Sequence, residues 1–119
     1  MGIESLDKIL GENWRGEAAL YYEGFVYWLE GYDDPKTGAS VFFIDRWKAK
    51  CEDGKVYHSY QSATRELEDY ACVYKDEAKE VKTLKERFQE AKVFAGKTFA
   101  EVEKQIAWVQ EGDPITSGA

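Results

Sequence analysis

The chain has 119 residues, a length typical of one domain with its own core. Its net charge of −7, from 16 basic and 23 acidic residues, disfavours nucleic-acid binding, which usually relies on a strongly basic surface. The chain holds 4 Trp, 8 Tyr and 6 Phe, while its 2 cysteines and single histidine lack the clustered spacing of a zinc site, so we expect neither a metal nor a cofactor.

The first residues combine acidic side chains with a short apolar pattern, which argues against a secretory signal. No run reaches the roughly 20 apolar residues that a membrane span needs, so we expect a cytoplasmic protein with no membrane partner. Ser5 is a candidate cap for a short helix, whose apolar side would include Leu6 and Leu10. Gly11 would end this helix.

Residues 17–30 are rich in Tyr, Phe, Val and Trp, which favour strands. Both faces of such a strand are apolar, which predicts a central strand or one covered on both sides. Gly24 indicates either a bulge or a turn that divides two strands, and a helix over residues 17–22 is the alternative. Residues 31–38, which contain one Pro and two Gly, predict a solvated loop.

Residues 40–62 predict two antiparallel strands with a turn at Asp53-Gly54. Asp-Gly between alternating apolar runs is typical of a type I′ hairpin turn. Glu52 then faces Lys55, and the alternation of period two sorts the side chains onto two faces. The face expected to be buried comprises Val41, Phe43, Trp47, Ala49, Cys51, Val56, His58 and Tyr60. Asp45 falls on the same face, which indicates a bulge or the end of pairing there.

The opposite face of this hairpin is basic and aromatic, and we expect it to meet solvent. Its candidate binding residues are Phe42, Ile44, Arg46, Lys48, Lys50 and Tyr57. Cations beside aromatic rings are typical of a stacking platform for nucleic acid. The alternative is a polar face that only keeps an antiparallel sheet soluble.

Apolar residues recur at steps of three and four between residues 67 and 91, the pattern of an amphipathic helix over residues 63–92. Residues 70–74 could instead form a fourth strand. A second helix is predicted to begin at Thr98, which has the spacing of a capping box with Glu101. Its apolar stripe comprises Phe99, Val102, Ile106 and Val109.

Two patterns were weighed for chemistry. Residues 91–98 fit the permissive form of a phosphate-binding loop, but such a loop follows a strand of a parallel sheet, and a helical pattern precedes it here. We interpret Gly96 as the end of one helix and Thr98 as the cap of the next. The single histidine, His58, has no serine at a spacing that marks a catalytic group, so we expect no enzymatic activity.

These elements predict an α+β domain. A small antiparallel sheet of three to four strands would pack against a long C-terminal helix plus a short helix, in the order α-β-β-β-α-α. Residues 1–112 would form this single domain, and residues 113–119 a flexible tail.

Tyr and Trp are enriched in interface hot spots, and no catalytic constellation accompanies them. The sequence therefore predicts a non-enzymatic protein-binding module, such as a small inhibitor, adaptor or accessory subunit. Its small, acidic and aromatic-rich character also suits inhibitors of phage or mobile-element origin. The alternative is a nucleic-acid or small-ligand binder that uses the basic and aromatic sheet face. A homodimer through an exposed strand edge is a further expectation left open.

Overall fold

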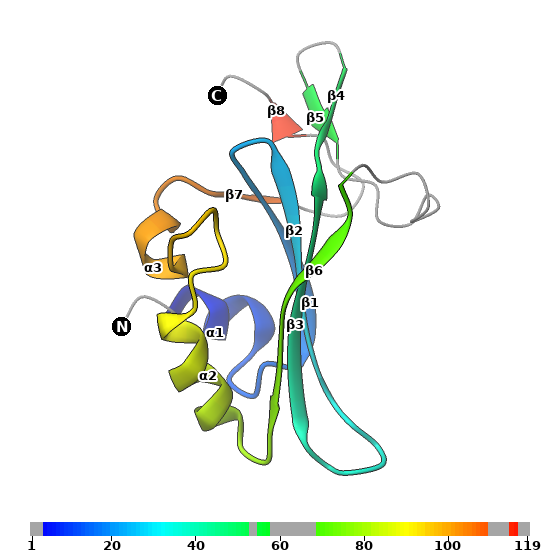
Figure 1. Cartoon of the computed structure of the whole chain (residues 1–119), viewed down its shortest axis with the longest axis vertical. Helices are drawn as coiled ribbons and strands as arrows, with labels where there is room; N and C mark the ends of the chain where they lie inside the picture. Colours follow the sequence, from blue (N-terminus) through cyan, green and yellow to red (C-terminus); the bar gives the residue numbers. More distant parts are fainter. Residues whose placement is uncertain (1–3, 53–54, 58–68, 110–114, 117–119) are drawn as a thin grey trace.

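A computed structural model describes residues 4–52, 55–57, 69–109 and 115–116. Its centre is a five-stranded antiparallel sheet in the order β6-β3-β2-β1-β7. The strands are β1 (Gly16–Tyr22), β2 (Phe25–Asp33), β3 (Ser40–Lys48), β6 (Ala71–Ala78) and β7 (Ala107–Val109). A second sheet at one end of the first joins β4 (Lys50–Glu52), β5 (Lys55–Tyr57) and β8 (Ile115–Thr116) (Figure 1).

Three helices lie on one face of the five-stranded sheet (Figure 1). They are α1 (Glu4–Leu10), α2 (Val81–Glu90) and α3 (Phe99–Val102). The predicted α+β class with an antiparallel sheet is confirmed. The predicted strand number and element order are wrong, because strands that the sequence pattern assigned to helices enlarge the sheet.

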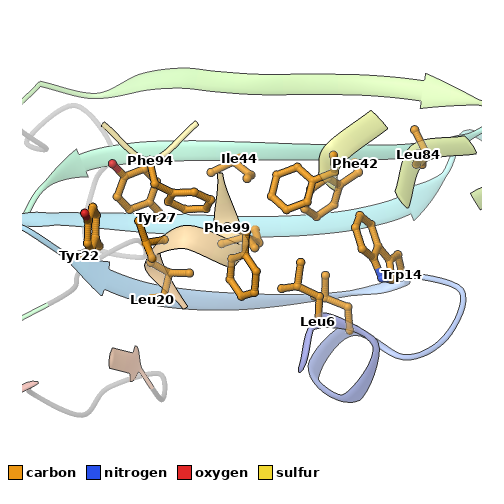
Figure 2. Close-up of a cluster of buried hydrophobic side chains, with 14 residues drawn as sticks. Leu6, Trp14, Leu20, Tyr22, Tyr27, Phe42, Ile44, Leu84, Phe94 and Phe99 are labelled. Atoms are coloured by element: carbon orange, nitrogen blue, oxygen red, sulfur yellow. The ribbon is translucent and has the colours of Figure 1, made fainter. Parts of the chain in front are cut away.

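The main core lies between the five-stranded sheet and the helices (Figure 2). Its buried members are Leu6, Leu10, Trp14, Leu20, Tyr22, Tyr27, Leu29, Phe42, Ile44, Leu84, Phe88, Phe94, Phe99 and Val102. Aromatic rings dominate the contacts: Trp14 lies 4.6 Å from Phe42 between ring centroids, and Tyr27 lies 4.8 Å from Phe94. This packing explains the high aromatic content as core material before any binding role is considered.

Gly24 is part of a tight turn between β1 and β2. Tyr22 pairs with Phe25, which leaves Glu23 and Gly24 as the two loop residues. Their φ angles of 47° and 88° are both positive, as a type I′ turn requires. The turn interpretation of Gly24 is therefore confirmed, and the helix alternative for residues 17–22 is wrong. Strand β2 extends through Asp33, so the predicted loop is reduced to residues 34–39.

The short hairpin of β4 and β5 has the predicted register, with Glu52 opposite Lys55 and Cys51 opposite Val56. Its turn and residues 58–62 lie outside the described part of the chain. The first predicted strand is interrupted, because β3 pairs with β2 and β6 rather than with β5. The irregularity expected at Asp45 is confirmed as a break in the β3–β6 register between Ile44 and Asp45.

The long predicted helix is wrong over residues 71–78, which form β6, and correct over α2. Residues 63–68 lie outside the described part. The helix predicted from Thr98 ends after one turn, and Ala107–Val109 pair with β1 as an edge strand. Pairing with β1 satisfies backbone groups that a longer helix would satisfy internally, and Trp and Val both favour strands.

Gly96 lies in a tight turn rather than at the end of α2. Phe94 and Lys97 exchange two backbone hydrogen bonds of 3.0 and 3.1 Å around Ala95 and Gly96. The Thr98 capping box is confirmed, since the Thr98 hydroxyl accepts from the Glu101 amide at 3.3 Å and the Glu101 carboxylate accepts from the Thr98 amide at 3.0 Å.

Candidate binding site at one end of the sheet

The predicted basic and aromatic face is closed at its centre. Phe42 and Ile44 are both 0% exposed and belong to the main core. The expectation that this face meets solvent is wrong at these two positions, because β3 is an inner strand and helices cover the same side of the sheet. Neither side chain can contact an external ligand in this structure.

The other predicted binding residues are divided between the two sheets. Arg46 is half-buried and Lys48 is exposed, and both end β3. Lys50 and Tyr57 pair with each other in the β4–β5 hairpin, and their side chains lie outside the described part of the chain. The six residues therefore do not form one continuous face, and a binding role for the last four stays a prediction.

Arg46 lies among aromatic residues that the sequence analysis did not select. It pairs with Tyr27 across β2, while Phe25 pairs with Lys48 on one side and Tyr22 on the other. The guanidinium carbon of Arg46 lies 4.5 Å from the centroid of the Phe25 ring, a cation–π contact. We define the Arg46 site as Tyr22, Phe25, Tyr27, Arg46 and Lys48.

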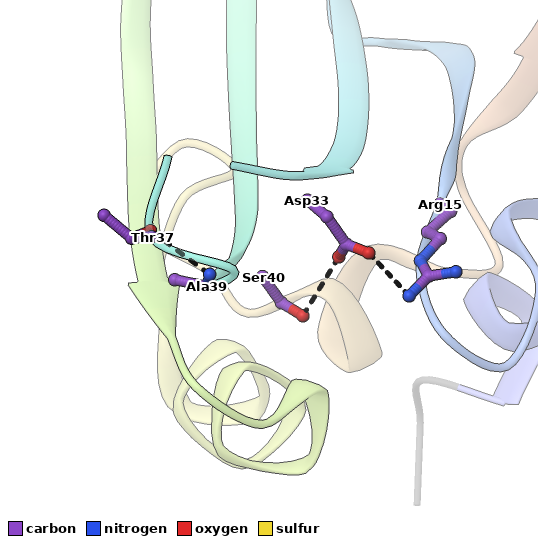
Figure 3. Close-up of polar contacts among 5 residues, drawn as sticks. All are labelled: Arg15, Asp33, Thr37, Ala39 and Ser40. Atoms are coloured by element: carbon purple, nitrogen blue, oxygen red, sulfur yellow. Dashed lines mark hydrogen bonds and ion pairs between the residues drawn. The ribbon is translucent and has the colours of Figure 1, made fainter. Parts of the chain in front are cut away.

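The charge of Arg46 has no acidic partner. Among the described residues, Arg15 pairs with Asp33 at 2.5 Å (Figure 3), and Arg87 Nε lies 2.8 Å from an oxygen of Asp76, at an angle that makes no hydrogen bond. No described carboxylate lies within ion-pairing distance of Arg46, and its Nε is buried without a hydrogen-bond acceptor. Buried charged groups are normally paired, so Arg46 departs from the usual pattern.

Tyr27 contributes a neutral hydroxyl beside this charge. Burial raises the pKa of Tyr27 above its ordinary value of 10.0, and the nearby Arg46 only partly opposes this rise. Tyr27 is therefore protonated at neutral pH. The Arg46 site thus combines one cation, aromatic surface and neutral hydroxyl groups, which suits binding rather than acid–base chemistry.

The sequence contained a signal for this site in the Glu23-Gly24 pair. A turn there fixes the register in which Tyr22 and Phe25 are opposite each other. Because Gly24 was left open between a bulge and a turn, the strands before and after it could not be sorted onto common faces.

A second polar group lies on the sheet face opposite the helices. Asp45 is 5% exposed and accepts a hydrogen bond of 2.5 Å from the Tyr70 hydroxyl, while the Tyr70 ring stacks on Trp47 at 6.3 Å. Cys72 pairs with Asp45 across β3 and β6. Burial, and secondly Asp45, raise the pKa of the Cys72 thiol above 9.0, so the thiol is not activated as a nucleophile.

Within the described ranges, no three His, Cys, Asp or Glu side chains gather as ligands for a metal ion. The helices of the described ranges are also too short or too polar to span a membrane. No protein-family model, curated protein or solved structure matches the chain. The residues of the Arg46 site are therefore the basis for a functional proposal.

Proposed function

We propose that the chain is a non-enzymatic protein-binding module, such as an inhibitor, adaptor or accessory subunit, and that it contacts its partner through the Arg46 site. The observation that carries this proposal is an arginine that lies over Phe25 without an acidic partner. Arg and Tyr are enriched among the residues that dominate binding energy at protein interfaces. An arginine already stacked on a ring also loses less conformational freedom on binding.

The electrostatic surroundings favour an acidic segment on the partner. Arg46 and Lys48 provide a local positive charge on a chain whose net charge is −7. Such a local contrast directs the orientation of a partner more than it adds affinity. An acidic group would therefore approach this end of the sheet in preference to the rest of the molecule.

The alternative, a nucleic-acid or small-ligand binder on an open sheet face, has lost support. Two of its six residues, Phe42 and Ile44, are buried in the core. A stacking platform needs aromatic rings exposed beside a row of phosphate-binding cations. Strong salt dependence of binding would favour this alternative, whereas an aromatic protein interface depends less on salt.

A capture experiment with matched variants tests the proposal. The wild-type chain, Arg46→Glu and Arg15→Glu are immobilised and exposed to nuclease-treated lysate of the native host. Both variants change the charge by the same amount, but Arg15 lies by Asp33, at the end of β2 farthest from Phe25 (Figure 3). We expect a stoichiometric protein partner on wild type and Arg15→Glu and its loss on Arg46→Glu. Equal capture by both variants, or recovery of nucleic acid alone, contradicts the proposal.

A further inference from the structure

The Arg46 site holds two buried hydrogen-bonding groups that lack partners. The hydroxyl of Tyr22, a residue only 2% exposed, and Nε of Arg46 have no hydrogen-bond partner among the described residues. Both can donate a hydrogen bond. Buried donors are nearly always satisfied in folded proteins, so this pair indicates an acceptor that comes from outside the chain.

The positions of the two groups suit a shared acceptor. Tyr22 lies on β1 and Arg46 on β3, and both flank β2 on the helix-covered side, where Phe25 and Tyr27 stand between them. Figure 2 shows the oxygen-bearing ends of Tyr22 and Tyr27 at the end of the core farthest from Trp14. The half-buried Arg46 keeps this end open to solvent, so an external group can reach it.

The chemistry of the donors selects the acceptor. Arg46 carries a full positive charge with no described carboxylate beside it, and Nε can only donate. A neutral acceptor would leave that charge uncompensated. The planar guanidinium, held over Phe25 at 4.5 Å, presents the Nε–Nη edge in the geometry that matches the two oxygens of a carboxylate.

We propose that Arg46, through its Nε–Nη edge, and the Tyr22 hydroxyl bind a carboxylate group that a partner protein supplies. This inference rests on the protein-binding function proposed above and names the group recognised at the same site. A single arginine balances the single charge of a carboxylate, whereas a phosphate monoester carries up to two. The carboxylate belongs either to an acidic side chain or to a C-terminus.

The first test uses acetate as the probe and the arginine Nε–H signals of the whole chain as the readout. The isotope-labelled protein is titrated with sodium acetate against sodium chloride at equal ionic strength and pH. We expect a saturable shift of the Arg46 signal with acetate and none with chloride. The signals of Arg15 and Arg87, which already lie beside Asp33 and Asp76, serve as internal controls.

Conservative variants separate a carboxylate site from general charge attraction. Tyr22→Phe should weaken acetate binding about tenfold, the effect of losing one hydrogen bond to a charged group. Arg46→Lys keeps the charge but loses the paired donors and should weaken it as well. Tyr32→Phe, which removes an exposed hydroxyl elsewhere on β2, should leave it unchanged. Equal acetate affinity of wild type and Tyr22→Phe overturns the inference, as does tighter binding of inorganic phosphate than of acetate.

Two blocked peptides then distinguish the source of the carboxylate. One carries an internal Asp and an amidated C-terminus, and the other carries no acidic side chain and a free C-terminus. Preference for one of them assigns the source, and no Arg46 shift with either overturns the inference. The outcomes also separate the two proposals. Acetate binding with undiminished partner capture by Arg46→Glu overturns only the protein-binding role of this site, whereas lost capture without any acetate response overturns only the carboxylate.

Discussion

Gly31 shows how closely the connection after α1 approaches the sheet. A Cβ at Gly31 would overlap the carbonyl oxygen of Trp14 and lie 2.9 Å from its carbonyl carbon. Trp14 cannot retreat, because its ring is 1% exposed and packs against Phe42 and Phe88. We expect Gly31→Ala to lower the free energy of unfolding by about 3 kcal/mol in urea denaturation.

The matched control is Gly38→Ala in the β2–β3 loop. A Cβ at Gly38 meets nothing within 4 Å, but the residue has a φ of 74°. The expected loss is about 1 kcal/mol, from backbone strain alone. If Gly31→Ala costs no more than Gly38→Ala, the close approach of Trp14 to β2 is wrong.

Tyr22 offers a stability test that is independent of any ligand. A buried hydroxyl without a partner destabilises the folded state, because it loses water without gaining a hydrogen bond. We therefore expect Tyr22→Phe to raise the free energy of unfolding by about 1 kcal/mol. Tyr27→Phe should lower it by a similar amount, since the Tyr27 hydroxyl lies beside Arg46. Thermal unfolding of both variants measures the contrast, and a loss of stability in Tyr22→Phe would show that its hydroxyl is satisfied.

At the scale of elements, α1 and α2 are joined by a polar link around Asp7. The Asp7 carboxylate accepts a hydrogen bond of 2.8 Å from Trp14 Nε1 and lies 2.9 Å from Lys85 Nζ. Lys85 also donates to the Glu12 carbonyl at 2.6 Å. Burial raises the pKa of Asp7, but Lys85 and Trp14 together outweigh it and hold the pKa below the ordinary 3.8.

A lowered folded-state pKa means that the link stabilises the protein above the ordinary pKa of 3.8 and that this stability is lost as the pH falls through the folded-state value. We expect Asp7→Asn to remove this part of the acid dependence. Because Asp7 is 37% exposed, the contribution is below about 1 kcal/mol. Urea titrations of wild type and Asp7→Asn from pH 7 to the acid limit check it. Identical pH slopes for the two proteins would contradict the link.

Elements with strong local signals were predictable. The positive-φ turn at Gly24, the capping box at Thr98 and the β4–β5 register depend on neighbouring residues. Strands β6 and β7 were not predictable in this way. Their partners, Ile44 and Leu20, are distant in sequence, and pairing overrode a helical pattern. The Arg46 site was half visible, since Arg46 was selected but its neighbours on β1 and β2 depended on the undecided turn.

At the scale of the whole molecule, several acidic groups favour the protonated form in the folded state. Burial raises the pKa of Tyr27 and Tyr74 above 10.0 and that of Cys72 above 9.0. The folded chain therefore binds more protons than the unfolded chain in alkaline solution, so stability is full below pH 9 and falls as the pH rises through these values. Thermal unfolding between pH 7 and 11 should show a progressive fall in midpoint. A flat profile would mean that these groups titrate alike in both states.

The strand order has a consequence for how the chain is made. Strands β1, β2 and β3 are consecutive, and short loops close them at little entropic cost. Their inner face is covered by later residues, since Phe94 packs on Tyr27 and Trp108 pairs with Leu20. During synthesis from the N-terminus, the first three strands can therefore assemble while their aromatic side still faces water. The emerging chain carries that exposed surface until its final segments arrive, and this interval is when it is most prone to aggregate.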